Sequence, residues 1–224
     1  KASDFVEVIG VSKIRNFPSD IISCTFNSGD GGNVDISTNR FTSLNGANIS
    51  SSTFSSGDAG NLIIDAVESV EVIGIEPNSL QKSFVNSITL NNGNGGNVIV
   101  NSQRVIVRDG GRIDASTIGS GGAGNITINA SDKVELLGSI PEFLIPSQIT
   151  SSADIADKSI QQLFGLPTIL NGESGTVTIN TSQFNIADGA VLAVKNDGSG
   201  NAGKLTVNAD SINIDNQANI SATT

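Results

Sequence analysis

Aliphatic residues recur along this chain at fixed distances from a glycine. Six phrases such as GGAGNITINA (121–130) place aliphatic side chains two and four residues after a marker glycine, and the residue between them varies freely. The markers are Gly32, Gly60, Gly96, Gly124, Gly175 and Gly203. The aliphatic pairs are Val34 and Ile36, Leu62 and Ile64, Val98 and Val100, Ile126 and Ile128, Val177 and Ile179, and Leu205 and Val207. This period of two predicts a strand with one buried face.

Two further short strands are predicted in each repeat. The second strands are 41–44, 70–72, 105–107, 134–136, 184–186 and 212–214. The third strands are 48–50, 87–89, 112–114, 148–150, 191–194 and 219–221. Turns between second and third strands contain Asn45-Gly46, Asp109-Gly110 and Asp188-Gly189, dipeptides that suit a positive φ.

The repeat spacing predicts the fold class. The markers lie 28, 36, 28, 51 and 28 residues apart, which is typical of a solenoid or a propeller. A propeller blade needs four antiparallel strands and an α/β horseshoe needs a recurring helix, so we disfavour both. The sequence predicts an all-β, right-handed parallel β-helix as a single domain over residues 1–224, with three short strands per coil and about six to seven coils.

Asparagines recur at two positions of the repeat and are expected to form amide ladders along the axis. The first set is Asn33, Asn61, Asn97 and Asn125, and the second is Asn101, Asn129, Asn180 and Asn208. We interpret both sets, like the marker glycines, as structural.

Lateral insertions interrupt alternate coils and are predicted at 11–20, 75–86, 139–147 and 152–173. The first three each contain a proline and a phenylalanine and should stack into a flap on one side. The fourth fits a short helix with Ala156, Ile160 and Leu163 on one face. We expect these apolar residues to pack against the coils, with binding of a partner or ligand as the alternative.

Both ends of the chain stop in mid-pattern. The first coil lacks its first strand, and the last lacks the glycine-rich turn that should follow. We therefore expect a fragment of a longer repeat array. Because exposed rod ends are adhesive unless capped, we also expect end-to-end self-association of this chain.

Charge and cysteine content narrow the classes of partner. Lys plus Arg number 12 against 22 Asp plus Glu, and the net charge of −10 disfavours nucleic acid and anionic membranes. No apolar run approaches the ~20 residues of a spanning helix, so no membrane insertion is expected. Cys24, the only cysteine, permits no internal disulfide and is expected to be a small buried residue. No signal peptide is recognisable.

The side chains that usually perform catalysis are scarce. The chain has no His, Trp, Tyr or Met, so the commonest general base and metal ligand is missing. Glu7, Glu71 and Glu135 should align on alternate coils, ~10 Å apart at normal strand spacing, which is too far for glycoside hydrolysis. We interpret these glutamates as a solvated face and expect no catalytic residue and no enzyme activity.

A charged cluster and an aspartate-rich turn are the remaining candidates. Arg104, Arg108, Asp109 and Arg112 form the densest charged cluster. We expect a surface ion pair between Arg108 and Asp109, with anionic-glycan contact as the alternative. The segment SGDGGNVD (28–35) suggests calcium, but other coils do not keep its carboxylate. We therefore predict no metal site, no cofactor and no cofactor-binding residue.

The repeats GSGGAGNITINASDKVELLG and GSGNAGKLTVNADSINI resemble those of filamentous-haemagglutinin-like exoproteins of two-partner secretion systems, especially their cyanobacterial members. The resemblance covers nearly the whole chain outside the insertions. It implies a secreted or surface-displayed β-helical stalk, often used in adhesion and exported through an outer-membrane partner. The family's NPN secretion element is absent from this sequence, so such export is an expectation for the parent protein. The shared motif is structural and carries over no functional residue.

We therefore expect a non-catalytic stalk segment of a secreted or bacterial cell-surface adhesin, with a cell-surface glycan or protein as receptor. The alternative is a carbohydrate-active β-helix, a lyase or hydrolase with a lateral cleft. Two carboxylates within ~5–10 Å in such a cleft would favour the enzyme. Ice binding by Thr127, Thr178 and Thr206 ranks third, because that row does not persist through the other coils.

Overall fold

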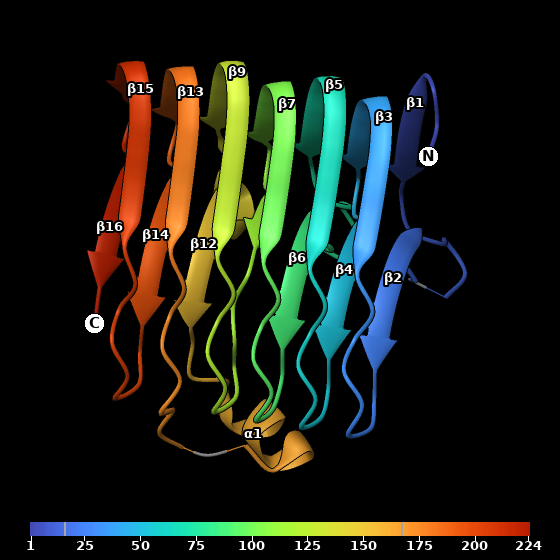
Figure 1. Cartoon of the computed structure of the whole chain (residues 1–224), viewed down its shortest axis with the longest axis vertical. Helices are drawn as coiled ribbons and strands as arrows, with labels where there is room; N and C mark the ends of the chain where they lie inside the picture. The colour runs from blue at the N-terminus through green and yellow to red at the C-terminus, as the bar shows by residue number, and fades with distance from the viewer. Residues whose placement is uncertain (16, 167) are drawn as a thin grey trace.

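The chain winds into a parallel β-helix built from two seven-stranded parallel sheets (Figure 1). The computed structural model describes residues 1–15, 17–166 and 168–224. The long sheet contains β1 (Phe5–Ile9), β3 (Val34–Leu44), β5 (Leu62–Ile73), β7 (Val98–Arg108), β9 (Ile126–Leu137), β13 (Val177–Ala187) and β15 (Leu205–Ile214). The short sheet contains β2 (Asp20–Thr25), β4 (Asn48–Thr53), β6 (Phe84–Thr89), β8 (Arg112–Asp114), β12 (Gln148–Ala153), β14 (Val191–Asn196) and β16 (Asn219–Thr223).

Successive coils lie directly over one another. The order of strands in each sheet follows the chain, so every coil adds one strand to each sheet. Val98 lies beside Ile126, and Ile126 lies beside Val177, on parallel strands. The predicted stacking of aliphatic pairs, and with it the predicted fold class, is confirmed.

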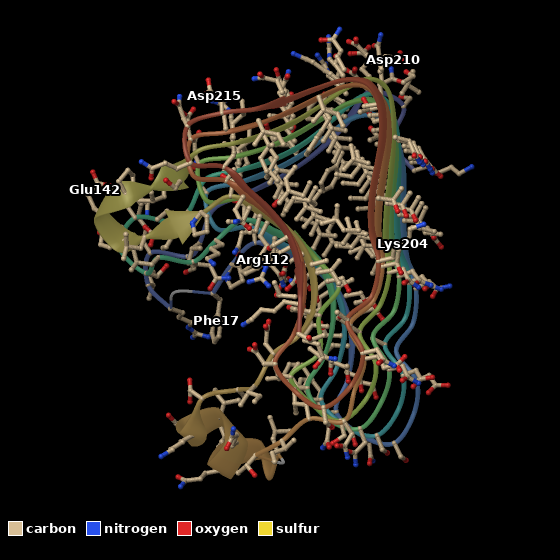
Figure 2. The ribbon with its side chains drawn as sticks, turned by 90° about the vertical axis from the view of Figure 1, so that its left-hand side faces the viewer. Phe17, Arg112, Glu142, Lys204, Asp210 and Asp215 are labelled. Carbon is tan, nitrogen blue, oxygen red and sulfur yellow. The ribbon has the colours of Figure 1, made fainter. Side chains whose placement is uncertain are left out.

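The long strands turn a corner midway. The register shifts between Thr38 and Arg40 in β3, and similar shifts recur in β5, β7 and β13. The first and second predicted strands of a coil are thus one bent strand, and each coil has two hydrogen-bonded strands that form three walls (Figure 2). Bulges preserve the pairing across the corner by absorbing an extra residue, since β5 and β9 have 12 residues and β7 has 11.

Figure 2 shows the handedness of the coil from its C-terminal end. From Lys204 the chain rises past Asp210 and then reaches Asp215, turning counter-clockwise as it advances toward the viewer. The helix is therefore right-handed, the hand expected of parallel crossovers.

Aliphatic side chains from all the walls fill the interior. Ten of the twelve aliphatics predicted from the repeat are buried, while Leu205 and Val207 on the outermost strand β15 are half-buried. The short sheet adds Ile49, Val85, Ile113, Ile149 and Leu192. Each fully buried aliphatic contributes roughly 1.5–3 kcal/mol before conformational entropy is counted.

Serine hydroxyls close the interior next to the glycine-rich turns. The Oγ atoms of Ser51, Ser87 and Ser151 donate hydrogen bonds to the carbonyl oxygens of Gly32, Gly60 and Gly124 at 3.1, 3.1 and 2.8 Å. A buried hydroxyl is costly without such a partner. These bonds therefore explain why serine replaces an aliphatic residue at this inward position.

Both predicted asparagine ladders form. In the second set, the Nδ2 atom of Asn129 donates to Oδ1 of Asn101, and Nδ2 of Asn180 donates to Oδ1 of Asn129, both at 2.8 Å. In the first set, Oδ1 of Asn61 accepts the backbone N–H of Asn97 at 2.9 Å. The outer surface is thus hydrogen-bonded from coil to coil by side chains as well as by backbone.

The first three insertions are short hairpins. Their antiparallel pairs are Val11 with Pro18, Ile75 with Lys82, and β10 (Ser139–Ile140) with β11 (Ile145–Pro146), the last enclosing the 3-10 turn η1 (Pro141–Phe143). All three project from the same side of the coils (Figure 2). Strand β6 takes up Phe84, so the second hairpin is shorter than the predicted insertion 75–86.

The fourth insertion contains helix α1 (Lys158–Phe164), capped by Asp157 and ended by Gly165 in the left-handed conformation. The expected apolar face does not pack as a unit, because Leu163 is 73% exposed. Leu166 and Leu170, which follow the helix, are buried instead and anchor the segment. Two residues of the predicted insertions 11–20 and 152–173, Asn16 and Pro167, lie outside the described residues.

Candidate functional site

The outer face of the short sheet forms a groove between two projections. The hairpin insertions project above it and α1 lies below it, on the same side of the coils, and Arg112 lies between them (Figure 2). We call this surface the lateral groove. A cavity of about 280 Å³ lies in it and is lined by Arg112, Gln148, Thr150, Ser152, Asp154, Val191, Ala193, Lys195, Ser221 and Thr223.

Strand alternation places charge on this face. Ile113 and Ala115 point into the core and are fully buried, so Arg112 and Asp114 point outward. Arg112 Nη2 lies 3.0 Å from Asp114 Oδ2. Asp114 Oδ1 accepts a hydrogen bond from Thr150 Oγ1 on the next coil at 3.1 Å. Asp114 is only 2% exposed, and these contacts compensate its burial.

One hydrogen-bonded network runs along the floor of the lateral groove across three coils. Its members are Arg112, Asp114, Ser116, Ser152, Asp154, Lys195 and Asp197. The hydroxyls of Ser116 and Ser152 lie 2.8 Å apart, and Ser152 Oγ donates to Asp154 Oδ2 at 2.6 Å. The two serines thus connect the carboxylate on β8 to the carboxylate that follows β12.

Lys195 lies between two carboxylates at the far end of this network. Its Nζ is 2.6 Å from Asp197 Oδ2 and 3.6 Å from Asp154 Oδ1. The hydrogen bond to Asp197, with the charge of Asp154, raises the pKa of Lys195 above its ordinary value. One ammonium thus lies within ion-pair distance of two carboxylates from neighbouring coils.

At the β8 end of the network, the positive charges of Lys82 and Arg112 are not fully compensated by carboxylates. Burial and the nearby charge of Arg112 lower the pKa of Lys82 below its ordinary value, and Asp114 offsets this in part. Among the described residues no carboxylate lies within ion-pair distance of Lys82. In the described part of the chain the buried Nε of Arg112 also has no hydrogen-bond partner. The two positive charges of Lys82 and Arg112 are therefore offset by the single negative charge of Asp114.

The structure divides the charged cluster singled out in the sequence. Arg108 and Asp109 form the expected exposed ion pair, with 3.5 Å between Nη1 and Oδ2. Arg104 lies on the long sheet in register with Lys133, and Arg112 alone of the four reaches the lateral groove. The four residues are thus not one binding surface, because the turn at Asp109 separates the two sheets.

The glutamate row lies where the sequence predicted it, away from the groove. Glu71 and Glu135 occupy equivalent positions on β5 and β9, separated by Ile106 on β7, and Glu7 is separated from Glu71 by Thr42. Lys133 Nζ lies 3.0 Å from Glu135 Oε1. The intervening residues keep these carboxylates two coils apart.

Asp30 of segment 28–35 and Asp58, its equivalent on the next coil, hold the coils together. Asp30 Oδ1 accepts the backbone N–H of Asp58 at 2.9 Å, and Asp58 Oδ1 accepts that of Asn94 at 2.7 Å. Among the described residues no group of three or more His, Cys, Asp or Glu is placed to hold a metal ion. Hydrogen bonding between coils thus accounts for Asp30 and Asp58 in this turn.

Cys24 and the threonine row lie on outer faces. Cys24 is half-buried beside Ser52 on the same face as the lateral groove, so the expectation that it is a buried core residue is wrong. Thr127, Thr178 and Thr206 are in register on the long sheet, but Ile99 precedes them in the row. The row is therefore interrupted, as the sequence indicates.

Most residues of the lateral groove were not predicted from the sequence. Lys82, Asp114 and Lys195 were not singled out, although all three lie in or next to third strands of the repeat. The only signal in the sequence was strand alternation, which places Asp114 and Lys195 on the outer face of the short sheet. That signal does not reveal which residues 36 or more positions apart become neighbours, such as Asp114 and Thr150.

Comparison of the chain with protein-family models, curated proteins and solved structures finds no match in any of the three. None of the helices in the described part of the chain has the length and apolar character needed to span a membrane.

Proposed function

We propose that this chain is a non-catalytic, rigid stalk segment of a secreted or cell-surface exoprotein of the filamentous-haemagglutinin-like type. In this role it holds a binding region away from the cell. The regular strand order of both sheets carries the proposal, since each coil adds one strand to each sheet, paired in parallel with the strand of the coil before it. Seven coils at ~4.8 Å give a rod of about 30 Å, and more coils would lengthen it without changing its cross-section.

Two observations support a rigid spacer. Side-chain ladders join the coils on the outside, in addition to the backbone hydrogen bonds of both sheets. The net charge of −10 favours solubility of a β-rich rod. Export through an outer-membrane partner and a cell-surface glycan or protein receptor belong to the same proposal, on the strength of the sequence resemblance.

A deletion of two coils tests this proposal. Removing residues 63–126 joins Leu62 to Thr127, which occupies the position of Ile63 two coils later. The shortened chain should fold, lose about 10 Å of length by small-angle scattering, and still present a terminal epitope when displayed on cells. Such tolerance is expected of a spacer.

The matched control removes one residue more, 63–127, and joins Leu62 to Ile128. This reverses the inward and outward alternation of the strand, so this variant should not fold. If the 63–126 deletion also failed to fold, or folded without becoming shorter, the modular stalk would be refuted.

A carbohydrate-active enzyme remains the second candidate, because the lateral groove holds two carboxylates on one ammonium. Asp154 and Asp197 both lie within 3.6 Å of Lys195 Nζ, close enough for the separations used by glycosidases. Depolymerisation of any soluble polysaccharide by the chain, abolished in Asp154→Asn and Asp197→Asn, would favour this candidate over the stalk.

A further inference from the structure

We propose that the lateral groove binds an acidic polysaccharide. Lys82 and Arg112 hold the carboxylate of one uronate residue, and the polar floor holds the hydroxyls of neighbouring sugars. This inference goes beyond the stalk and does not depend on it.

Lys82 and Arg112 lie near each other on neighbouring coils. The backbone N–H of Arg112 donates to the carbonyl oxygen of Ser83 at 2.9 Å and Phe84 is the register partner of Arg112, so Lys82 lies diagonally beside Arg112, two positions before that partner. Ser83 is buried and its Oγ donates inward to the carbonyl oxygen of Ile73 at 2.7 Å. Alternation around Ser83 therefore directs Lys82 and Phe84 outward, beside Arg112.

The positive charges of Lys82 and Arg112 are only partly compensated by the carboxylate of Asp114. Arg112 contacts Asp114 through Nη2, and its buried Nε has no hydrogen-bond partner among the described residues. The lowered pKa of Lys82 reflects burial beside a second positive charge. An incoming carboxylate would lie beside both positive charges and pair with the exposed part of the Arg112 guanidinium, since the two groups match in planar hydrogen-bond geometry.

The cavity next to Arg112 is lined by neutral polar groups. Gln148 supplies an amide that donates and accepts hydrogen bonds, and Thr150 and Ser152, whose hydroxyl protons go to Asp114 and Asp154, supply acceptor oxygens for sugar hydroxyls. Val191 and Ala193 supply an apolar patch on the same floor for the C–H face of a sugar ring. Neutral hydrogen-bonding groups, a small apolar surface and one anion anchor together fit a uronate-containing glycan.

The floor of the lateral groove suits an extended ligand. The floor crosses successive strands along the axis, so equivalent positions recur at the ~4.8 Å spacing of the coils. An extended polymer can therefore contact several coils in turn. Nucleic acid fits poorly, because no aromatic side chain lines the cavity for base stacking.

Calorimetry with oligogalacturonate on the full chain tests the proposal, and the methyl ester of the same oligosaccharide serves as the uncharged ligand. We expect binding of the acid and at least tenfold weaker binding of the ester. Lys82→Gln should weaken binding of the acid at least tenfold, and Lys82→Arg, which keeps the charge, should retain it. The matched control Lys204→Gln removes a charge from the opposite wall and should change affinity less than twofold (Figure 2).

Several results would overturn the proposal. The first is that oligogalacturonate does not bind at millimolar concentration, and the second is that the acid and the ester bind equally well. The third is an unchanged affinity in a Lys82→Gln variant that unfolds at the same temperature as the parent. Equal affinity for dextran sulfate would indicate a general anion surface and would also overturn it. None of these results bears on the two-coil deletion, so the two proposals fail independently.

Discussion

A single missing Cβ atom sets how closely the coils approach. At Gly124 an added Cβ would overlap the carbonyl oxygen of Gly96 on the preceding coil, and Gly60, Gly175 and Gly203 stand in the same relation to their neighbours. Five of the six marker glycines, all except Gly32, therefore permit backbone-to-backbone contact in the turn. Glycine recurs at this position because no other residue leaves the required space.

Two glycines in one turn provide a matched test. Gly124→Ala should destabilise the protein by about 2–3 kcal/mol or more, because the obstructing atoms are backbone. Gly122→Ala should change stability by less than about 1 kcal/mol, since its Cβ would meet Asn94 Oδ1 only at 3.5 Å. Chemical denaturation of both variants checks this, and equal losses would contradict the close-approach explanation.

The asparagine ladder makes a second prediction at this scale. Asn129→Ala removes one donated and one accepted hydrogen bond and should cost about 1–2 kcal/mol. Asn129→Asp keeps only the acceptor and should cost less. Asn185, an outward residue of β13 without such a bond among the described residues, provides the control. Urea unfolding should rank the three variants in that order, and an Asn129→Ala loss no larger than that of Asn185→Ala would contradict it.

The hairpins are elements with their own local stabilisation. Glu76 accepts the backbone N–H of Ser79 at 2.6 Å and that of Asn78 at 3.0 Å. These bonds, led by the one from Ser79, lower the pKa of Glu76 below 4.5. The turn of hairpin 75–82 is thus organised by one carboxylate that must be ionised.

Acid should therefore loosen this hairpin. A lowered folded-state pKa gives stabilisation that is complete above 4.5 and lost as the pH falls through the folded value. The amide resonance of Ser79 should titrate with a midpoint below 4.5, and Glu76→Gln should abolish the titration. Hairpin 139–146 provides the comparison, because no carboxylate hydrogen bond organises its turn in the described structure. A midpoint at or above 4.5 would show that the ionised form is not favoured.

At the scale of the whole molecule, the stacking of coils stabilises the fold and also leaves the outermost coil uncovered. Every coil covers the next, and the outermost strand β15 leaves Leu205 and Val207 half-buried, with Ile212 and Ile214 50% and 56% exposed. An uncovered strand edge beside apolar side chains favours pairing with another copy of the chain.

We therefore expect this chain to associate end to end at high concentration. Ile214→Lys should shift sedimentation toward monomer, because a charge on an edge strand opposes pairing. Val67→Lys should not, since Val67 is 71% exposed on the side wall and away from the ends. Monomeric sedimentation of the parent chain at high concentration, or equal effects of the two lysines, would refute end-to-end contact.

The sequence determined the fold because the repeat is local and one-dimensional. The alternating aliphatic residues, the marker glycines and the asparagines all recur once per coil. A single arrangement, in which equivalent residues of successive coils stack on one another, therefore agrees with all three patterns. The corner in the long strands was not predicted, because a bulge and a break between strands produce the same gap in an aliphatic pattern.

Only the tertiary structure decided the lateral groove. Its network joins residues from β8, β12, β14 and the segments that follow them, and Lys82 comes from a hairpin outside the repeat. Periodicity shows which side chains point outward. It does not show which of them face one another beneath an insertion, because insertion length and the depth of burial are not periodic. The charges of Lys82, Arg112 and Asp114 acquired a shared environment only when the coils stacked and the hairpins covered their upper edge.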